Sequence, residues 1–83
     1  MKNIIVIHET DKADGEKSVI GVASTRENAL EIINEYYGEA QHTIIDFIDV
    51  RDSNIDFKCT IEVEEPYGGI YYICGEDFVI DVL

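Results

Sequence analysis

The stretch that decides the fold is STRENALEIINEYYGEA, residues 24–40. Placed at 100° per residue, its apolar side chains fill one continuous arc of a helix and its polar side chains fill the other. Ser24 followed by Glu27 has the pattern of a capping box, and Gly38 is a typical stop signal. The stretch therefore predicts an amphipathic helix, from about Thr25 to Tyr37, that lies on a sheet. Its apolar arc consists of Ala29, Leu30, Ile32, Ile33, Tyr36 and Tyr37.

Two apolar runs precede this helix. Asn3–His8 (NIIVIH) is β-branched and apolar at nearly every position, as expected for a central strand covered on both faces. The polar segment Glu9–Lys17 contains the turn signal Asp14-Gly15 and leads into a second run, Ser18–Ala23 (SVIGVA). The two runs predict a hairpin with a long or bulged loop.

After the helix the apolar period changes. Thr43–Val50 (TIIDFIDV) fits a short helix or a strand, and its Ile, Phe and Val content favours a strand. In Ile55–Val63 apolar residues alternate strictly with polar ones, which indicates a half-buried strand. Pro66–Gly69 turns this strand back into Ile70–Cys74, and Gly75-Glu76 fits a type II′ turn into a last strand, residues 77–83.

The order of these elements predicts an α+β fold. We expect a single domain, residues 1–83, with a ββα start followed by a β-meander and one helix packed on a mainly antiparallel sheet of four to six strands. A single helix covers one face of such a sheet, so the other face is expected to be covered by a partner or by a second copy, as a homodimer. The apolar positions left for that face include Tyr71, Ile73, Val79 and Leu83.

Composition limits the class of protein. The chain has 83 residues, is 46% hydrophobic and carries a formal net charge of -12. This hydrophobic content is too high for a disordered acidic tail. No apolar run near the start is long enough for a membrane span or a signal peptide, so a cytoplasmic protein is expected. Its two cysteines are too few for a disulfide framework, and free thiols are expected.

Candidate catalytic groups are His8, His42, Cys59 and Cys74. If Glu64 pairs with Gly69 across the Pro66 turn, the antiparallel register places the two cysteines opposite each other. Such a pair is compatible with metal binding or redox chemistry, or with two small buried apolar side chains. We favour the last interpretation and predict reduced, metal-free thiols and no cofactor.

Two further motifs resemble ligand sites. The spacing Asp52-x-Asn54-x-Asp56 is that of the start of a calcium loop, but Phe57 and Val63 stand where the loop needs glycine and the bidentate glutamate. Turn chemistry between two strands is the favoured interpretation. The glycine pair before Ile70 is not a phosphate cradle, because no helix follows it.

Acidic side chains are unpaired along the polar side of the helix. Glu27, Glu31 and Glu35, here called the acidic ridge, form two like-charge pairs at i,i+4, and each pair costs a few tenths of a kcal/mol. With 6 basic and 18 acidic residues, the chain repels nucleic acid and favours a protein partner with a basic surface. The alternative is that the acids serve solubility alone.

The stretch IGVASTRENALEII, with the preceding NIIVIHE, resembles small uncharacterised bacterial and phage proteins. These open with a strand, a polar loop, an "IGV-S-x-E-x-A" segment and a helix. The likeness covers less than half of the chain and implies a bacterial or phage source but no activity. The residues that carry it are Ile20, Gly21, Val22, Ser24, Glu27 and Ala29.

The sequence as a whole predicts a small acidic, non-enzymatic module of bacterial, phage or mobile-element origin. Its acidic ridge would bind a basic protein, and it is expected to inhibit that protein by imitating the charge of a nucleic acid. Neither a membrane nor a nucleic acid is expected as a direct partner. The alternative is a small thiol- or metal-dependent module that uses Cys59, Cys74 and a histidine.

Overall fold

The computed structural model describes residues 2–38, 41–52, 54–64 and 68–80. Within these ranges the chain forms one helix and five strands. In chain order the elements are β1 (Lys2–Asp11), β2 (Lys17–Ala23), α1 (Arg26–Tyr36), β3 (His42–Asp52), β4 (Ile55–Val63) and β5 (Gly69–Ile80).

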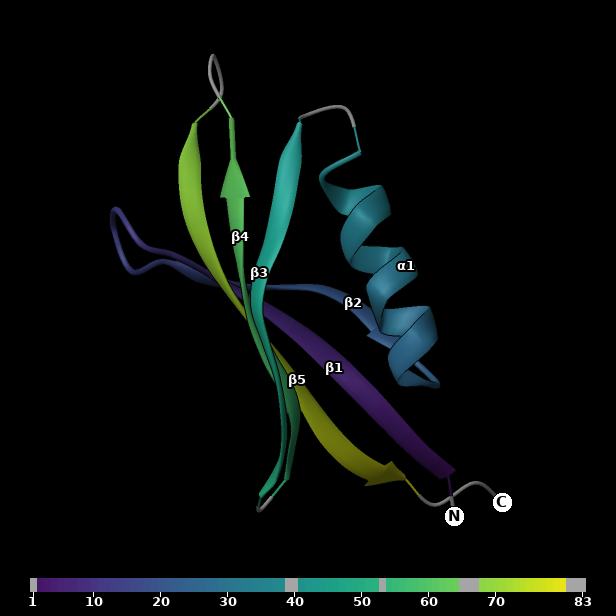
Figure 1. The fold of residues 1–83 in the computed structure, drawn as a ribbon. Helices are drawn as coiled ribbons and strands as arrows, with labels where there is room; N and C mark the ends of the chain where they lie inside the picture. The colour runs from purple at the N-terminus through teal and green to yellow at the C-terminus, as the bar shows by residue number, and fades with distance from the viewer. Residues whose placement is uncertain (1, 39–40, 53, 65–67, 81–83) are drawn as a thin grey trace.

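The five strands form one antiparallel sheet in the order β2-β1-β5-β4-β3, which places β5 and not β1 at the centre. The predicted α+β class is confirmed. Helix α1 lies across one face of this strongly twisted sheet (Figure 1). We call the face that α1 covers the inner face and the opposite one the outer face. Among the described residues, no helix lies on the outer face.

The core lies between α1 and the inner face. From the helix, Ala29, Ile33 and Tyr37 are buried, as the apolar arc predicted, whereas Tyr36 of the same arc is 53% exposed. The sheet contributes buried residues from four of its strands, and along a strand they alternate because successive side chains point to opposite faces. The largest fully buried side chains are Phe57, Ile7, Ile33, Ile61 and Ile73.

The helix begins one residue later than the predicted capping box. Thr25, not Ser24, is the N-cap, and its hydroxyl accepts a hydrogen bond from the backbone N–H of Asn28 at 3.0 Å. Asn28 in turn accepts from the backbone N–H of Ser24 at 3.4 Å, so the reciprocal pattern is kept with a different pair. Glu27 therefore has no capping role, although its charge still lies in the first turn.

Strands β3 and β4 follow the sequence closely. The strand interpretation of residues 43–50 is confirmed. The alternation in β4 is confirmed by the burial of Phe57, Cys59, Ile61 and Val63. Asp56 is the exception, since it was expected on the polar side and is only 6% exposed. A register shift between Ile55 and Phe57 turns Asp56 toward the inner face.

The predicted turn at Gly75-Glu76 is wrong, because β5 runs through it without a break from Gly69 to Ile80. A Cβ at residue 75 would overlap the ring of Phe57, which packs directly on the backbone there. Gly75 thus serves close packing inside a strand, and its role is not to reverse the chain. The separate last strand, residues 77–83, does not form within the described part of the chain, which ends at Ile80.

The uninterrupted β5 also corrects which apolar side chains face outward. Ile73 is part of the core, and Tyr71 packs against it. Val79 is opposite Asn3 of β1, on the same face as buried Ile5. None of these three residues lies on the outer face, and Leu83 lies outside the described residues. The alternating β5 residues, such as Tyr72 and Phe78, occupy the outer face instead.

We predict that Gly75→Ala lowers the free energy of unfolding by about 1 to 3 kcal/mol, the usual cost of overpacking a filled core. Urea unfolding followed by circular dichroism measures this change. The double variant Gly75→Ala, Phe57→Leu should lose less stability than the sum of the two single losses. The smaller leucine side chain makes room for the new methyl group. Strictly additive losses would show that the two residues are not in contact.

Candidate functional site

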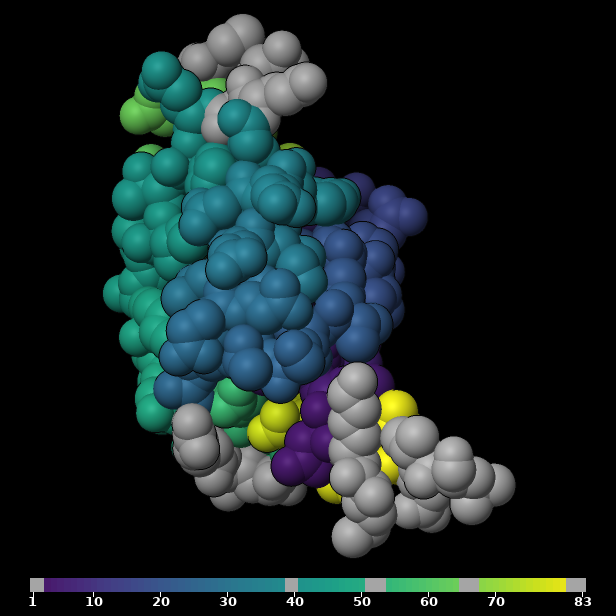
Figure 2. Space-filling model, turned by 90° about the vertical axis from the view of Figure 1, so that its right-hand side faces the viewer, coloured from purple at the N-terminus to yellow at the C-terminus, as the bar shows by residue number. Residues whose placement is uncertain are grey.

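The acidic ridge lies along the exposed side of α1. Glu27, Glu31 and Glu35 are all exposed. In Figure 2 the helix occupies the middle of the surface, with β2 on one side of it and β3 on the other. The last turn of α1 contains no basic residue. The ridge is therefore presented on the surface, with about 6 Å between neighbouring Cβ atoms.

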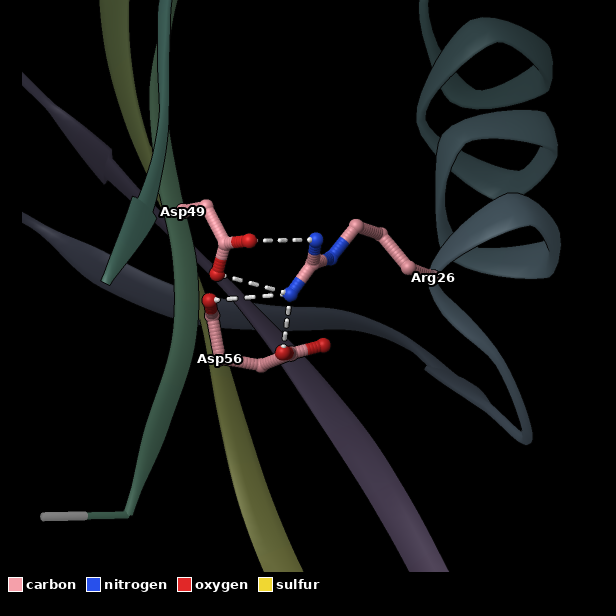
Figure 3. Close-up of polar contacts among 3 residues, drawn as sticks. All are labelled: Arg26, Asp49 and Asp56. Carbon is pink, nitrogen blue, oxygen red and sulfur yellow. Dashed lines mark hydrogen bonds and ion pairs between the residues drawn. The ribbon is translucent and has the colours of Figure 1, made fainter. Parts of the chain in front are cut away.

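Arg26, the basic residue of α1, points from the helix toward the sheet (Figure 3). Its two terminal nitrogens contact both carboxylate oxygens of Asp49 in β3, at 3.1 and 3.0 Å. The Nη2 atom also donates to the Asp56 carboxylate at 2.5 Å and to the Asp56 backbone carbonyl at 3.5 Å. A bidentate arginine and a buried aspartate together attach the start of the helix to β3 and β4.

The two carboxylates hold Arg26 in its charged state. The hydrogen bonds to Asp56 and then Asp49 raise the pKa of the guanidinium well above its usual value, against an opposing effect of burial. The Nε atom of Arg26 is buried with no partner among the described residues. Because this guanidinium is hydrogen-bonded to carboxylates of the sheet, it does not neutralise the acidic ridge. Sequence reasoning missed this cluster, although an arginine at the start of the helix was visible.

We predict that Arg26→Met lowers the free energy of unfolding by about 3 kcal/mol, because it removes the guanidinium that is hydrogen-bonded to the buried Asp56 carboxylate. Asp49→Asn is the matched control, since Asp49 is half exposed and its loss should cost less than about 1 kcal/mol. The double variant Arg26→Met, Asp56→Asn should lose less free energy of unfolding than the sum of the losses of the two single variants. Equal losses for Arg26→Met and Asp49→Asn, measured by urea unfolding, would contradict this assignment.

The predicted pairing of the two cysteines is wrong by one residue. Strand β4 meets β5 with Val63 opposite Gly69, so Cys59 is opposite Ile73, and Cys74 is opposite Lys58. A shift of one residue reverses the face of every side chain. Cys59 therefore lies in the core and Cys74 on the outer face, and the two thiols do not form one site. Both are free cysteines.

The environments of the two thiols oppose nucleophilic chemistry. Burial raises the pKa of Cys59 from 9.0 to about 11. Burial also raises the pKa of Cys74, and the charge of Lys58 only partly offsets this. Both shifts favour the neutral thiol over the reactive thiolate at neutral pH.

Neither histidine lies in a convincing catalytic arrangement. His8 lies opposite Cys74 on the outer face, and its Nε2 atom is 3.0 Å from a carboxylate oxygen of Glu76. His42 lies on the inner face, where its Nε2 atom is 3.0 Å from the Asn34 side-chain oxygen. Its ring lies 5.5 Å from that of Tyr37. The two histidines are thus on opposite faces of the sheet.

The side chains of Asn54 and Asp56 in the calcium-like motif Asp52-x-Asn54-x-Asp56 do not converge on one site. Asn54 donates to Glu76 at 2.9 Å, whereas Asp56 is occupied by Arg26. The structure does not describe the Asp52 side chain. In the part of the chain that is described, no group of three or more His, Cys, Asp or Glu side chains is placed to hold a metal ion.

Comparisons with known proteins found no matching family model, no similar curated protein and no similar solved structure. Within residues 2–38, 41–52, 54–64 and 68–80, no helix is long and apolar enough to span a membrane. Any functional conclusion therefore depends on the geometry and charge of this chain.

We predict that the protein loses stability in alkali through Cys59. In the unfolded chain this thiol ionises near pH 9, but in the folded chain it stays neutral until about pH 11, so ionisation favours unfolding between these values. The loss by pH 11 should be about 2 kcal/mol. Cys59→Val should remove that part of the pH dependence, measured by urea unfolding at pH 8 to 11, and Cys74→Ser should remove less. A Cys59→Val profile parallel to that of the wild type would contradict the burial of this thiol.

Proposed function

We propose that this protein is a small, acidic, non-enzymatic binding module whose acidic ridge contacts a basic surface of another protein. The observation that carries the proposal is the division of charge on α1. The arginine of the helix is bound by Asp49 and Asp56, while Glu27, Glu31 and Glu35 are exposed and form no ion pair among the side chains that the structure describes.

An unneutralised ridge has a measurable cost. Repulsion between Glu27 and Glu31, and between Glu31 and Glu35, destabilises the helix by a few tenths of a kcal/mol for each pair. The positive end of the helix dipole favours Glu27 but not Glu35, which lies in the last turn. A partner that supplies positive charge turns this repulsion into attraction and speeds association.

A groove that normally holds nucleic acid is the partner surface that best complements such a row of carboxylates. We propose that the module inhibits a nucleic-acid-binding protein by occupying its basic groove, and that it is a cytoplasmic protein of bacterial, phage or mobile-element origin. The net charge of -12 supports steering toward such a groove and disfavours direct binding of nucleic acid. The thiol alternative receives no support from the placement of Cys59 and Cys74 on opposite faces.

We predict that replacing both Glu31 and Glu35 with lysine raises the free energy of unfolding by several tenths of a kcal/mol and abolishes partner capture. The stability gain follows from removing like-charge pairs, and the binding loss follows from reversing the ridge. Glu16→Lys with Glu64→Lys is the matched control, since both glutamates are exposed, lie outside α1, and give the same change in net charge.

The experiment is an affinity capture from the source cell with the wild type, the ridge variant and the control immobilised in parallel. The wild type and the control should retain the same protein, with an affinity that falls steeply as salt is added, and duplex DNA should displace it. Retention of the same proteins by the ridge variant, with unchanged affinity at all salt concentrations, would show that the acids serve solubility alone.

A further inference from the structure

The outer face of the sheet carries an extended apolar surface. Val19 and Val22 of β2, Ile48 of β3, and Tyr72 and Phe78 of β5 are each between 41% and 58% exposed. The strand registers place them on one side, together with Ile4, Val6, Ile45 and Ile80. Exposed apolar side chains gathered on one face of a protein often mark a contact surface. We call these nine residues the outer apolar patch.

The centre of this face is hollowed. A depression of about 560 Å³ lies among β1, β3, β4 and β5, open to the surface. Tyr72, Ile48 and Cys74 form part of its lining, and Lys17 and Lys58 border it with Asp46. The depression therefore combines apolar side chains with both signs of charge.

The outer face differs in charge from the rest of the molecule. Among the side chains that the structure describes on this face, Lys17 and Lys58 stand against Asp46 and Glu62, and Glu76 is hydrogen-bonded to His8 and Asn54. The described acids elsewhere, including the acidic ridge, far outnumber the described cations. Two copies with a net charge of -12 each repel one another most strongly through their acidic surfaces. The nearly balanced outer face is the surface on which they can approach.

The free edges of the sheet are poor alternatives for self-association. Strand β3, at one edge of the sheet, pairs with β4 with register shifts. Its residue Asp46 has a left-handed backbone with φ of 54°. The pairing of β2, the other edge strand, is also shifted, opposite Ile7 and His8. Bulges and charged side chains hinder continuous pairing with another strand. Face-to-face packing is therefore favoured over extension of the sheet.

We propose that the outer face is the interface of a homodimer in which two copies pack their sheets against each other. Lysines and carboxylates on the same face suit a two-fold contact, in which a lysine of one copy meets a carboxylate of the other. A basic protein would find less negative charge on this face than anywhere else on the described surface, so a second copy is the better complement. The acidic ridges, on the far side of each sheet, stay exposed in the dimer.

The test is analytical ultracentrifugation of the purified full chain at rising concentration. We expect a monomer–dimer equilibrium whose dissociation constant decreases as salt is added, because screening reduces the repulsion between two acidic copies. Binding of a basic partner by the ridge has the opposite salt dependence. Because the measurement needs no partner, its failure would leave the proposed function standing, and failure of partner capture would leave the dimer standing.

Tyr72→Lys and Phe78→Lys should each weaken the dimer at least tenfold, since each buries a new charge in the interface. Both substitutions lower the net negative charge, so greater overall repulsion cannot explain the loss. Val79→Lys is the matched control, because Val79 adjoins Phe78 in β5, lies on the opposite face and is 62% exposed. Circular dichroism establishes that each variant is folded.

Alkylation of Cys74 by iodoacetamide gives a second readout that needs no substitution. Cys74 lines the depression and is less deeply buried than Cys59, so its labelling rate should fall at least severalfold as concentration drives dimer formation. A chain that remains monomeric at several hundred micromolar in high salt would overturn the proposal. A dimer that is unaffected by Tyr72→Lys and Phe78→Lys, with Cys74 labelled at a constant rate, would also overturn it.

Discussion

One helix of 11 residues is the only helical cover that the described part of this five-stranded sheet receives. Since an α-helix rises 1.5 Å per residue, it spans about 16 Å, enough to cover part of one face. The core is accordingly confined to the space between α1 and the inner face. The buried arc of the helix and the exposed state of the outer face both follow from this limit.

The attachment of the helix is both apolar and ionic. Ala29 and Ile33 fill the middle of the layer, and Arg26 fixes the first turn by reaching Asp49 and Asp56 on the far strands. An ion pair that includes a buried carboxylate contributes less to stability than its contacts suggest, because both charges lose water. Its geometric effect is more important here. It fixes the helix across β3 and β4 and removes a cation from the surface that carries the acidic ridge.

The two faces of the molecule thus present different surfaces to a partner. The helix side carries the exposed glutamates of the acidic ridge, whose interactions are long-ranged and weakened by salt. The outer side carries apolar groups with nearly balanced charge, whose association is short-ranged and depends on burial. A homodimer through the outer face would present two acidic ridges, one on each side of the assembly, and would increase avidity for a partner with two basic sites.

The sequence alone determined the helix, its buried arc and the strand alternation, because these depend on local periods of 3.6 and 2 residues. It also determined that Arg26 is the one basic residue of α1. Tertiary structure decided the remaining features. Gly75 looked like a turn residue because its local conformational freedom was visible, whereas the ring of Phe57 above it was not. The face of Cys74 depended on a register that differs by one residue from the predicted one, since a turn motif does not fix where the ladder begins. The burial of Asp56 required a cation brought from another element, a long-range contact that no local pattern encodes.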